Sequence, residues 1–177
     1  LIVFAGNSFV QLPITTDYVS AKMFLNSIST ESVPVQGTAM GDAINTAIRS
    51  FSAQSEKSRA IIVITDGENH EDDPVEAARQ AAEMGIRVFT IGVGSPEGKP
   101  IPYGPNGDLM KDKDGNIVVT KLNEKILEEV AAAGNGAYVR AGNAEFGLNP
   151  IIDDLRQLQE QQFKSVVFED FEEQYMY

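Results

Sequence analysis

Two nearly continuous apolar runs mark the centre of this chain. Residues 59–65 and 86–93 show no regular alternation of polar and apolar positions. Such runs are typical of central parallel strands that are covered on both faces. Between them, Asp73 and Pro74 precede a segment, 75–84, whose apolar residues recur at helical spacing. Strand, helix and strand in this order predict a right-handed parallel crossover.

The flanking segments predict further elements of the same architecture. Apolar runs at 1–5 and 9–14, joined around Gly6 and Asn7, predict an antiparallel hairpin, and 137–139 predicts a last strand. Helical spacing predicts four more helices: one capped by Thr16 or Asp17 that buries Tyr18, Ala21, Leu25 and Ile28; one from Thr38 to Phe51; one capped by Asn123 and ended by Gly134; and one over 149–162. We therefore expect an α/β fold, in which a mainly parallel sheet with one antiparallel edge strand carries helices on both faces.

The segment 95–119 interrupts this rhythm with four prolines and the turn-forming pairs Asn106-Gly107 and Asp114-Gly115. It predicts an inserted loop that carries a small hairpin with its tip near Asp114-Gly115. Residues 1–163 then form one domain, and residues 164–177 form an acidic and aromatic C-terminal segment.

Composition narrows the functional classes. A chain of 177 residues with 42% hydrophobic residues suits one globular domain with a sizeable core. The net charge of −12 repels phosphate backbones and argues against nucleic-acid binding. The absence of cysteine removes disulfides, thiolate nucleophiles and cysteine-based zinc sites. No window reaches the roughly 18 apolar residues of a membrane helix and no basic leader begins the chain, so we expect a soluble fragment.

Candidate chemistry gathers at one rim of the predicted sheet. Asp66 directly follows the apolar strand at 59–65, and ligands of open parallel sheets bind beyond the carboxyl ends of the strands. The segment 36–41 opens a helix and offers the Thr38 hydroxyl together with free backbone N–H groups. Together they predict a metal or anion site.

Simpler interpretations compete with this site. Thr38 could merely cap the helix, and Asp66 could bond its own backbone in a turn. Asp42, one helical turn after Thr38, is better explained as an exposed acid of the first turn. His70 beside Glu68 could bind a metal, but a solvated surface histidine is the more common case.

Five stretches in order support a more specific interpretation: 1–6 (LIVFAG), 12–18 (LPITTDY), 37–41 (GTAMG), 64–69 (ITDGEN) and 91–94 (IGVG). In this order they resemble the von Willebrand factor A domains, in particular the bacterial membrane-anchored group of the aerotolerance (BatA and BatB) proteins. The hallmark of that family is a metal-ion-dependent adhesion site. There an Asp-x-Ser-x-Ser loop, a Thr from a second loop and an Asp from a third hold Mg²⁺ or Mn²⁺.

The resemblance identifies Thr38 as the second-loop ligand and Asp66 as the third-loop carboxylate. Hydroxyl, carboxylate and water oxygens suit a hard cation, and a vacant position can accept a carboxylate from a partner. The sequence contains no Asp-x-Ser-x-Ser motif, and Leu1 corresponds to the family's second strand. We therefore expect that the first strand, its metal loop and the first helix are missing, and that this fragment binds the cation weakly or not at all. The same gap leaves strand edges at 1–5 and 60–65 that favour strand exchange between copies.

The resemblance also implies a function and a setting. It implies a metal-dependent protein-interaction module anchored in the bacterial inner membrane and facing the periplasm, with a membrane helix near the end of the chain. The implied partners are other Bat-type envelope proteins and a MoxR-type ATPase system, and the loop at 95–119 could set the choice of partner.

No Ser-His-acid arrangement is present, so we expect no enzyme activity. Two alternatives remain: a metal-assisted hydrolase that uses Asp66 with Glu68 and His70, and a structural scaffold that needs no metal.

Overall fold

The computed structural model describes residues 1–29, 32–33, 35, 37–51, 58–69, 72–103, 107–112, 114–142, 149 and 151–157 of the 177-residue chain. His70 and the C-terminal segment 164–177 therefore lie outside the described residues, as do residues 150 and 158–162 of the helix predicted over 149–162. Residues 151–157 are helical.

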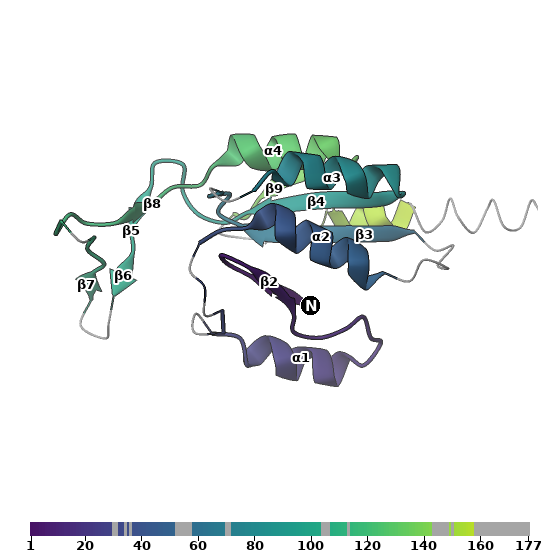
Figure 1. Ribbon diagram of the computed structural model, residues 1–177, viewed down its shortest axis with the longest axis horizontal. Helices are drawn as coiled ribbons and strands as arrows, with labels where there is room; N and C mark the ends of the chain where they lie inside the picture. Colours follow the sequence, from purple (N-terminus) through teal and green to yellow (C-terminus); the bar gives the residue numbers. More distant parts are fainter. Residues whose placement is uncertain are drawn as a thin grey trace, which may run out of the picture.

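The centre of the fold is a three-stranded parallel sheet in the order β3, β4, β9 (Figure 1). Strand β3 (Arg59–Thr65) pairs with β4 (Ile86–Gly92), and β4 pairs with β9 (Tyr138–Arg140). Helices α3 (Pro74–Glu83) and α4 (Glu124–Ala133) are the two crossovers between these strands. The predicted α/β architecture and the parallel crossover from 59–65 to 86–93 are confirmed.

Strand β4 lies between two apolar layers. Val88 is fully buried among residues of α2 (Met40–Ser50), α3 and α4, whereas Phe89 is fully buried on the other face beside Ile151. The turn that follows α4 lies so close to β4 that a Cβ on Gly136 would lie 2.1 Å from the carbonyl oxygen of Val88. Both faces of β4 are therefore covered, as the continuous apolar run predicts.

Local signals position the helix starts as expected. Asp73 caps α3 by accepting a hydrogen bond from the Glu76 N–H at 3.0 Å, with Pro74 in the first turn. Asn123 caps α4 and Asp17 caps α1 (Tyr18–Asn26). These caps join nearby residues, so the sequence alone could predict them.

The antiparallel strands form a separate sheet rather than an edge of the central one. Among the described strands, β1 (Ile2–Phe4) pairs with β2 (Ser8–Val10) alone, and α2 contacts both β1 and β3. The half-buried Asp42 fastens this hairpin to α2, because its Oδ2 accepts hydrogen bonds from the Ser8 N–H at 2.9 Å and the Ser8 hydroxyl at 2.6 Å. The interpretation of Asp42 as a merely exposed helix acid was wrong.

Two burial expectations are also wrong. Helix α1 buries none of its residues, with Tyr18 78% and Leu25 57% exposed, because it lies beside the hairpin and away from the central sheet (Figure 1). On β3, Ile61 and Val63 are buried against the helices, but Ile62 and Ile64 are 41% and 56% exposed on the other face. In the described structure β3 is thus an edge strand with one uncovered face.

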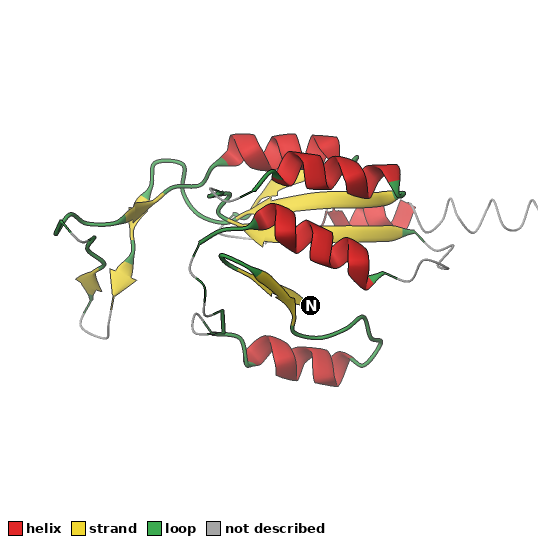
Figure 2. Ribbon diagram, in the orientation of Figure 1, coloured by secondary structure: helices red, strands yellow, loops and turns green. Residues whose placement is uncertain are grey.

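The inserted segment is a small antiparallel ribbon that projects from one end of the sheet (Figure 2). Strand β5 (Lys99–Pro100) pairs with β8 (Val119–Thr120), and β6 (Pro102–Tyr103) pairs with β7 (Asp108–Leu109). At the predicted tip, the Asp112 carboxylate accepts hydrogen bonds from the Asp114 and Asn116 N–H groups. The side-chain amide of Asn116 also donates to Asp112 and is the main cause that lowers its pKa. This carboxylate therefore closes a turn.

Candidate metal-binding rim

A hollow of about 480 Å³ opens at the carboxyl end of β3. Four chain segments line it: Phe4 and Ala5 at the end of β1, Gly37 and Thr38 before α2, Ile64, Thr65 and Asp66 at the end of β3, and Val93 after β4. The structure thus brings the two predicted site residues, Thr38 and Asp66, to one hollow. They meet because β3 ends at the same edge of the sheet at which α2 begins.

Thr38 is not the cap of the helix that follows it. Helix α2 begins at Met40, and its N-cap residue is Ala39, which offers no side-chain cap. The segment is fixed by its backbone, because the Ala39 N–H donates to the carbonyl oxygen of Ala5 at 2.6 Å. Within the described part of the chain, the Thr38 hydroxyl has no hydrogen-bond partner. It is therefore available to a ligand in the hollow.

Asp66 is held on both of its carboxylate oxygens. Its Oδ1 accepts a hydrogen bond from the Glu68 N–H at 3.1 Å, which is the local turn that the sequence allowed. Its Oδ2 lies 3.1 Å from the hydroxyl of Thr120. The Asp66 carbonyl oxygen accepts a further bond from the Asn123 N–H at 2.8 Å. Asp66 is thus both a turn residue and a fixed carboxylate at the rim.

Thr120 is a rim residue that sequence reasoning missed. It lies 54 residues from Asp66 in the chain, in β8 at the base of the ribbon, and its hydroxyl is also 3.1 Å from Glu68 Oε1. No local pattern could indicate this contact, because it depends on how the inserted segment 95–119 folds back onto the loop after β3.

The backbone N–H groups at the start of α2 are not free for an anion. The Asp72 carboxylate accepts from the Gly41 N–H at 3.0 Å and from the Asp42 N–H at 2.7 Å. Asn69 Oδ1 accepts from the Met40 N–H at 3.3 Å. The loop after β3 therefore supplies the negative charge that the helix N-terminus attracts, and the prediction of an anion site there is wrong.

The donor set fits a weakly held hard cation. Thr38 offers a hydroxyl and Asp66 a carboxylate, which are oxygen ligands of the kind that Mg²⁺ and Mn²⁺ prefer, and the hollow has room for water. Among the described residues, no three His, Cys, Asp or Glu side chains gather at one point. The chain itself therefore provides only part of a coordination shell.

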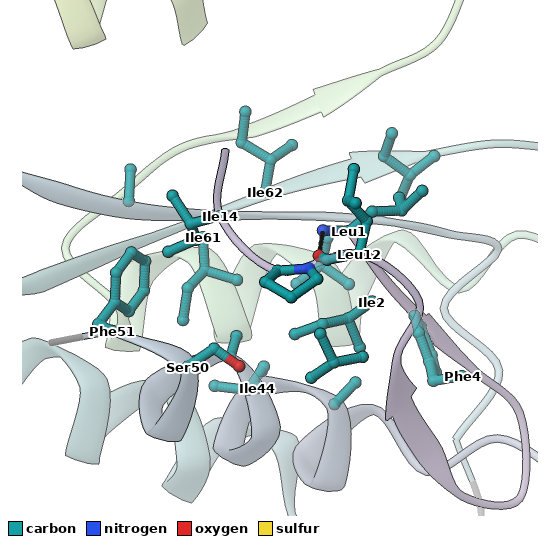
Figure 3. A pocket seen from close by; sticks show the side chains of 17 residues that line it. Leu1, Ile2, Phe4, Leu12, Ile14, Ile44, Ser50, Phe51, Ile61 and Ile62 are labelled. Carbon is teal, nitrogen blue, oxygen red and sulfur yellow. Dashed lines mark hydrogen bonds between the residues drawn. The ribbon is translucent and has the colours of Figure 1, made fainter. Parts of the chain in front are cut away.

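A second, apolar groove of about 380 Å³ separates the hairpin from β3. Its lining residues include Ile2 and Phe4 of the hairpin and Ile61 and Ile62 of β3 (Figure 3). Phe4 and Ile64 line both the groove and the hollow, so the two spaces adjoin. The groove runs along the edge of β3 that pairs with no other described strand.

Comparison with known proteins identifies the fold. The profile of the von Willebrand factor type A domain matches residues 1–131. The chain belongs to this family. No curated protein matches the chain.

Two solved structures resemble this von Willebrand factor A domain over most of its length. BatB, a conserved hypothetical protein of Bacteroides thetaiotaomicron, is 53% identical over 90% of this chain and 78% of its own, with a TM-score of 0.86. A serine-substituted form of an aerotolerance-related membrane protein of Bacteroides fragilis is 51% identical over 88% and 77%, with a TM-score of 0.83.

A mussel byssus protein, proximal thread matrix protein 1, shares only the fold. It is 19% identical over 87% of this chain and 32% of its own, with a TM-score of 0.57. In the described part of this chain, no helix is long and apolar enough to cross a membrane.

Proposed function

We propose that this von Willebrand factor A domain is a metal-ion-dependent protein-interaction module. The observation that carries the proposal is that Thr38 and Asp66, from separate elements, line one hollow at the carboxyl end of β3. The Thr38 hydroxyl and an Asp66 oxygen would hold Mg²⁺ or Mn²⁺, and water would complete most of the shell.

The charge of the domain gives the cation a role in partner binding. A net charge of −12 disfavours the approach of an acidic partner, and positive charge at the rim would offset this repulsion for a carboxylate that binds there. The cation would supply that charge at the rim. A partner's carboxylate is then the group that this site selects.

In this proposal the domain is not an enzyme. Hydrolytic chemistry would need a further acid or histidine that converges on Asp66, and Glu68, whose N–H donates to Asp66, is a candidate among the described residues. Glu68 Oε1 accepts a hydrogen bond from the Lys121 N–H at 3.4 Å and lies 3.1 Å from the Thr120 hydroxyl, so these contacts direct it to the ribbon.

The relatives of the module support a proposal for its setting. Because its relatives include BatB and an aerotolerance-related membrane protein, we propose a role in a bacterial envelope assembly of the same kind. In this role the intact protein is anchored in the inner membrane and faces the periplasm. Its partners are other Bat-type proteins and a MoxR-type ATPase system.

Mn²⁺ titration by calorimetry tests the proposal directly. We compare the wild-type chain with Asp66→Asn, which removes the negative charge and one of the two carboxylate oxygens, and with Thr38→Val, which removes the hydroxyl; both keep the side-chain shape. Glu83→Gln, at the exposed end of α3, is the control that removes one negative charge elsewhere.

We expect saturable binding of about millimolar affinity in the wild type and the control, with loss in both rim variants. Equal heats in all four proteins would show nonspecific cation binding and contradict the proposal. No heat in any of them would favour a scaffold that needs no metal.

A further inference from the structure

The base of the inserted ribbon is bonded directly to the loop that carries Asp66. The Lys121 N–H donates to Glu68 Oε1 at 3.4 Å, and the Asn123 N–H donates to the Asp66 carbonyl oxygen at 2.8 Å. The next contact lies within the ribbon base itself, where the Leu122 N–H donates to the Ser95 carbonyl oxygen at 3.0 Å. The rim and the ribbon base therefore form one hydrogen-bonded unit.

Thr120 occupies the centre of this unit and faces a conflict. Its hydroxyl lies 3.1 Å from Asp66 Oδ2 and 3.1 Å from Glu68 Oε1. A hydroxyl has one hydrogen to donate, and an ionised carboxylate can only accept. The hydroxyl can therefore satisfy one carboxylate at a time, and the other then faces its lone pairs.

We propose that Thr120 is a positioning residue for the rim. Its single hydroxyl hydrogen couples the binding of a cation at Asp66 to the base of the inserted ribbon. This inference rests on the proposed function for the identity of the ligand at Asp66, but the coupling itself is a property of the chain. When Asp66 faces no cation, the hydroxyl can hold its Oδ2 in place. When a cation balances Asp66, the hydroxyl can turn to Glu68, which also accepts from the backbone of Lys121.

The coupling has two measurable consequences. Groups that orient metal ligands through a hydrogen bond commonly change metal affinity by about 10-fold to 100-fold when removed. We therefore expect about tenfold weaker Mn²⁺ binding in Thr120→Val, which keeps the shape and loses the hydroxyl. Thr120→Ser keeps the hydroxyl and should restore the affinity. Thr16→Val, on the exposed segment before α1, is the matched control.

If Thr120 had a purely structural role, cation binding at Asp66 would not change the surroundings of Lys121 through it. The second measurement is therefore spectroscopic. In amide NMR spectra, Mg²⁺ should shift the Lys121 signal in the wild type and in Thr120→Ser, but not in Thr120→Val. A Lys121 shift of equal size in Thr120→Val would overturn the proposal, because the signal would then travel without the hydroxyl.

A metal-free measurement separates failure of the coupling from failure of the proposed function. Asp66→Asn changes the group that faces Thr120 without any cation. It should move the Lys121 amide signal clearly further when residue 120 is Thr than when it is Val, because the Glu68 N–H, which donates to Asp66 in both proteins, can carry only the remaining part of the effect. If this dependence holds while no variant binds Mg²⁺ or Mn²⁺, the metal-binding function is wrong and the coupling stands. If the Lys121 signal moves equally in both backgrounds, the coupling is wrong whatever the metal data show.

Discussion

The start of α2 depends on a carboxylate from a distant loop, and removing it should cost measurable stability. In Asp72→Ala the N–H groups of Gly41 and Asp42 lose acceptors at 3.0 and 2.7 Å. The N-cap residue Ala39 has no side chain that could replace them. Loss of a helix cap costs about 1 kcal/mol, and loss of a negative charge at a helix N-terminus costs up to about 1 kcal/mol more.

We therefore expect the free energy of unfolding to fall by about 2 kcal/mol, which for a chain of this length lowers Tm by about 4–8 °C. Urea unfolding followed by circular dichroism gives the free energy, and calorimetry gives Tm. Asp72→Asn keeps one acceptor oxygen and should lose less than Asp72→Ala. Glu83→Ala removes an acid that caps nothing and should change little. A loss below about 0.5 kcal/mol in Asp72→Ala, or an equal loss in Glu83→Ala, would refute the capping argument.

Three further outcomes follow from packing, ionisation and strand edges. Gly136→Ala would force a methyl group to within 2.1 Å of a β4 carbonyl oxygen and should destabilise the chain by about 3 kcal/mol in thermal unfolding. Gly107→Ala should cost less, because its methyl group meets open space and adds only the backbone strain of a φ of 77°. The pKa of Tyr138 is raised above its unfolded value of about 10, mainly by burial and then by the hydrogen bond and charge of Glu124. The protonated Tyr138 side chain therefore stabilises the fold fully below pH 10, and this contribution is lost as the pH rises above 10. Urea unfolding at pH 8 and pH 11 should show a larger loss for the wild type than for Tyr138→Phe, and equal losses would contradict this sign. If copies associate through the open edge of β3, light scattering should show concentration-dependent oligomers that Ile62→Lys abolishes, and a wild type that stays monomeric at high concentration would disprove strand exchange.

Elements whose signals lie within a few residues could be predicted from the sequence. The caps at Asp17, Asp73 and Asn123 each accept a hydrogen bond from an N–H two or three residues later. Neighbouring residues in the sequence are therefore enough to predict them. The apolar runs at 59–65 and 86–92 pair in parallel because each is long enough for a strand and a helix joins them. Strand direction then fixes where Asp66 lies.

What the sequence could not predict depends on contacts between distant segments. An apolar run shows that a strand can be buried on both faces, but not that both faces are covered, and Ile62 and Ile64 are exposed in the described structure. The cap of α2 comes from Asp72, 31 residues after Gly41. Capping rules consider only the residues just before a helix, so they could not find it.

The two halves of the rim differ in how firmly they are held, and this difference decides how a cation would bind. Asp66 is fixed by the Glu68 N–H and by Thr120, so its carboxylate needs little ordering before it meets a ligand. Among the described residues, the segment of Thr38 is fixed through the backbone bond of the neighbouring Ala39, and the Thr38 hydroxyl must still adopt one rotamer. A cation would therefore be oriented mainly from the Asp66 side, where the ribbon is attached. Thr38→Val should then remove one ligand and leave the remaining geometry intact, whereas Thr120→Val should keep both ligands and loosen the more rigid one.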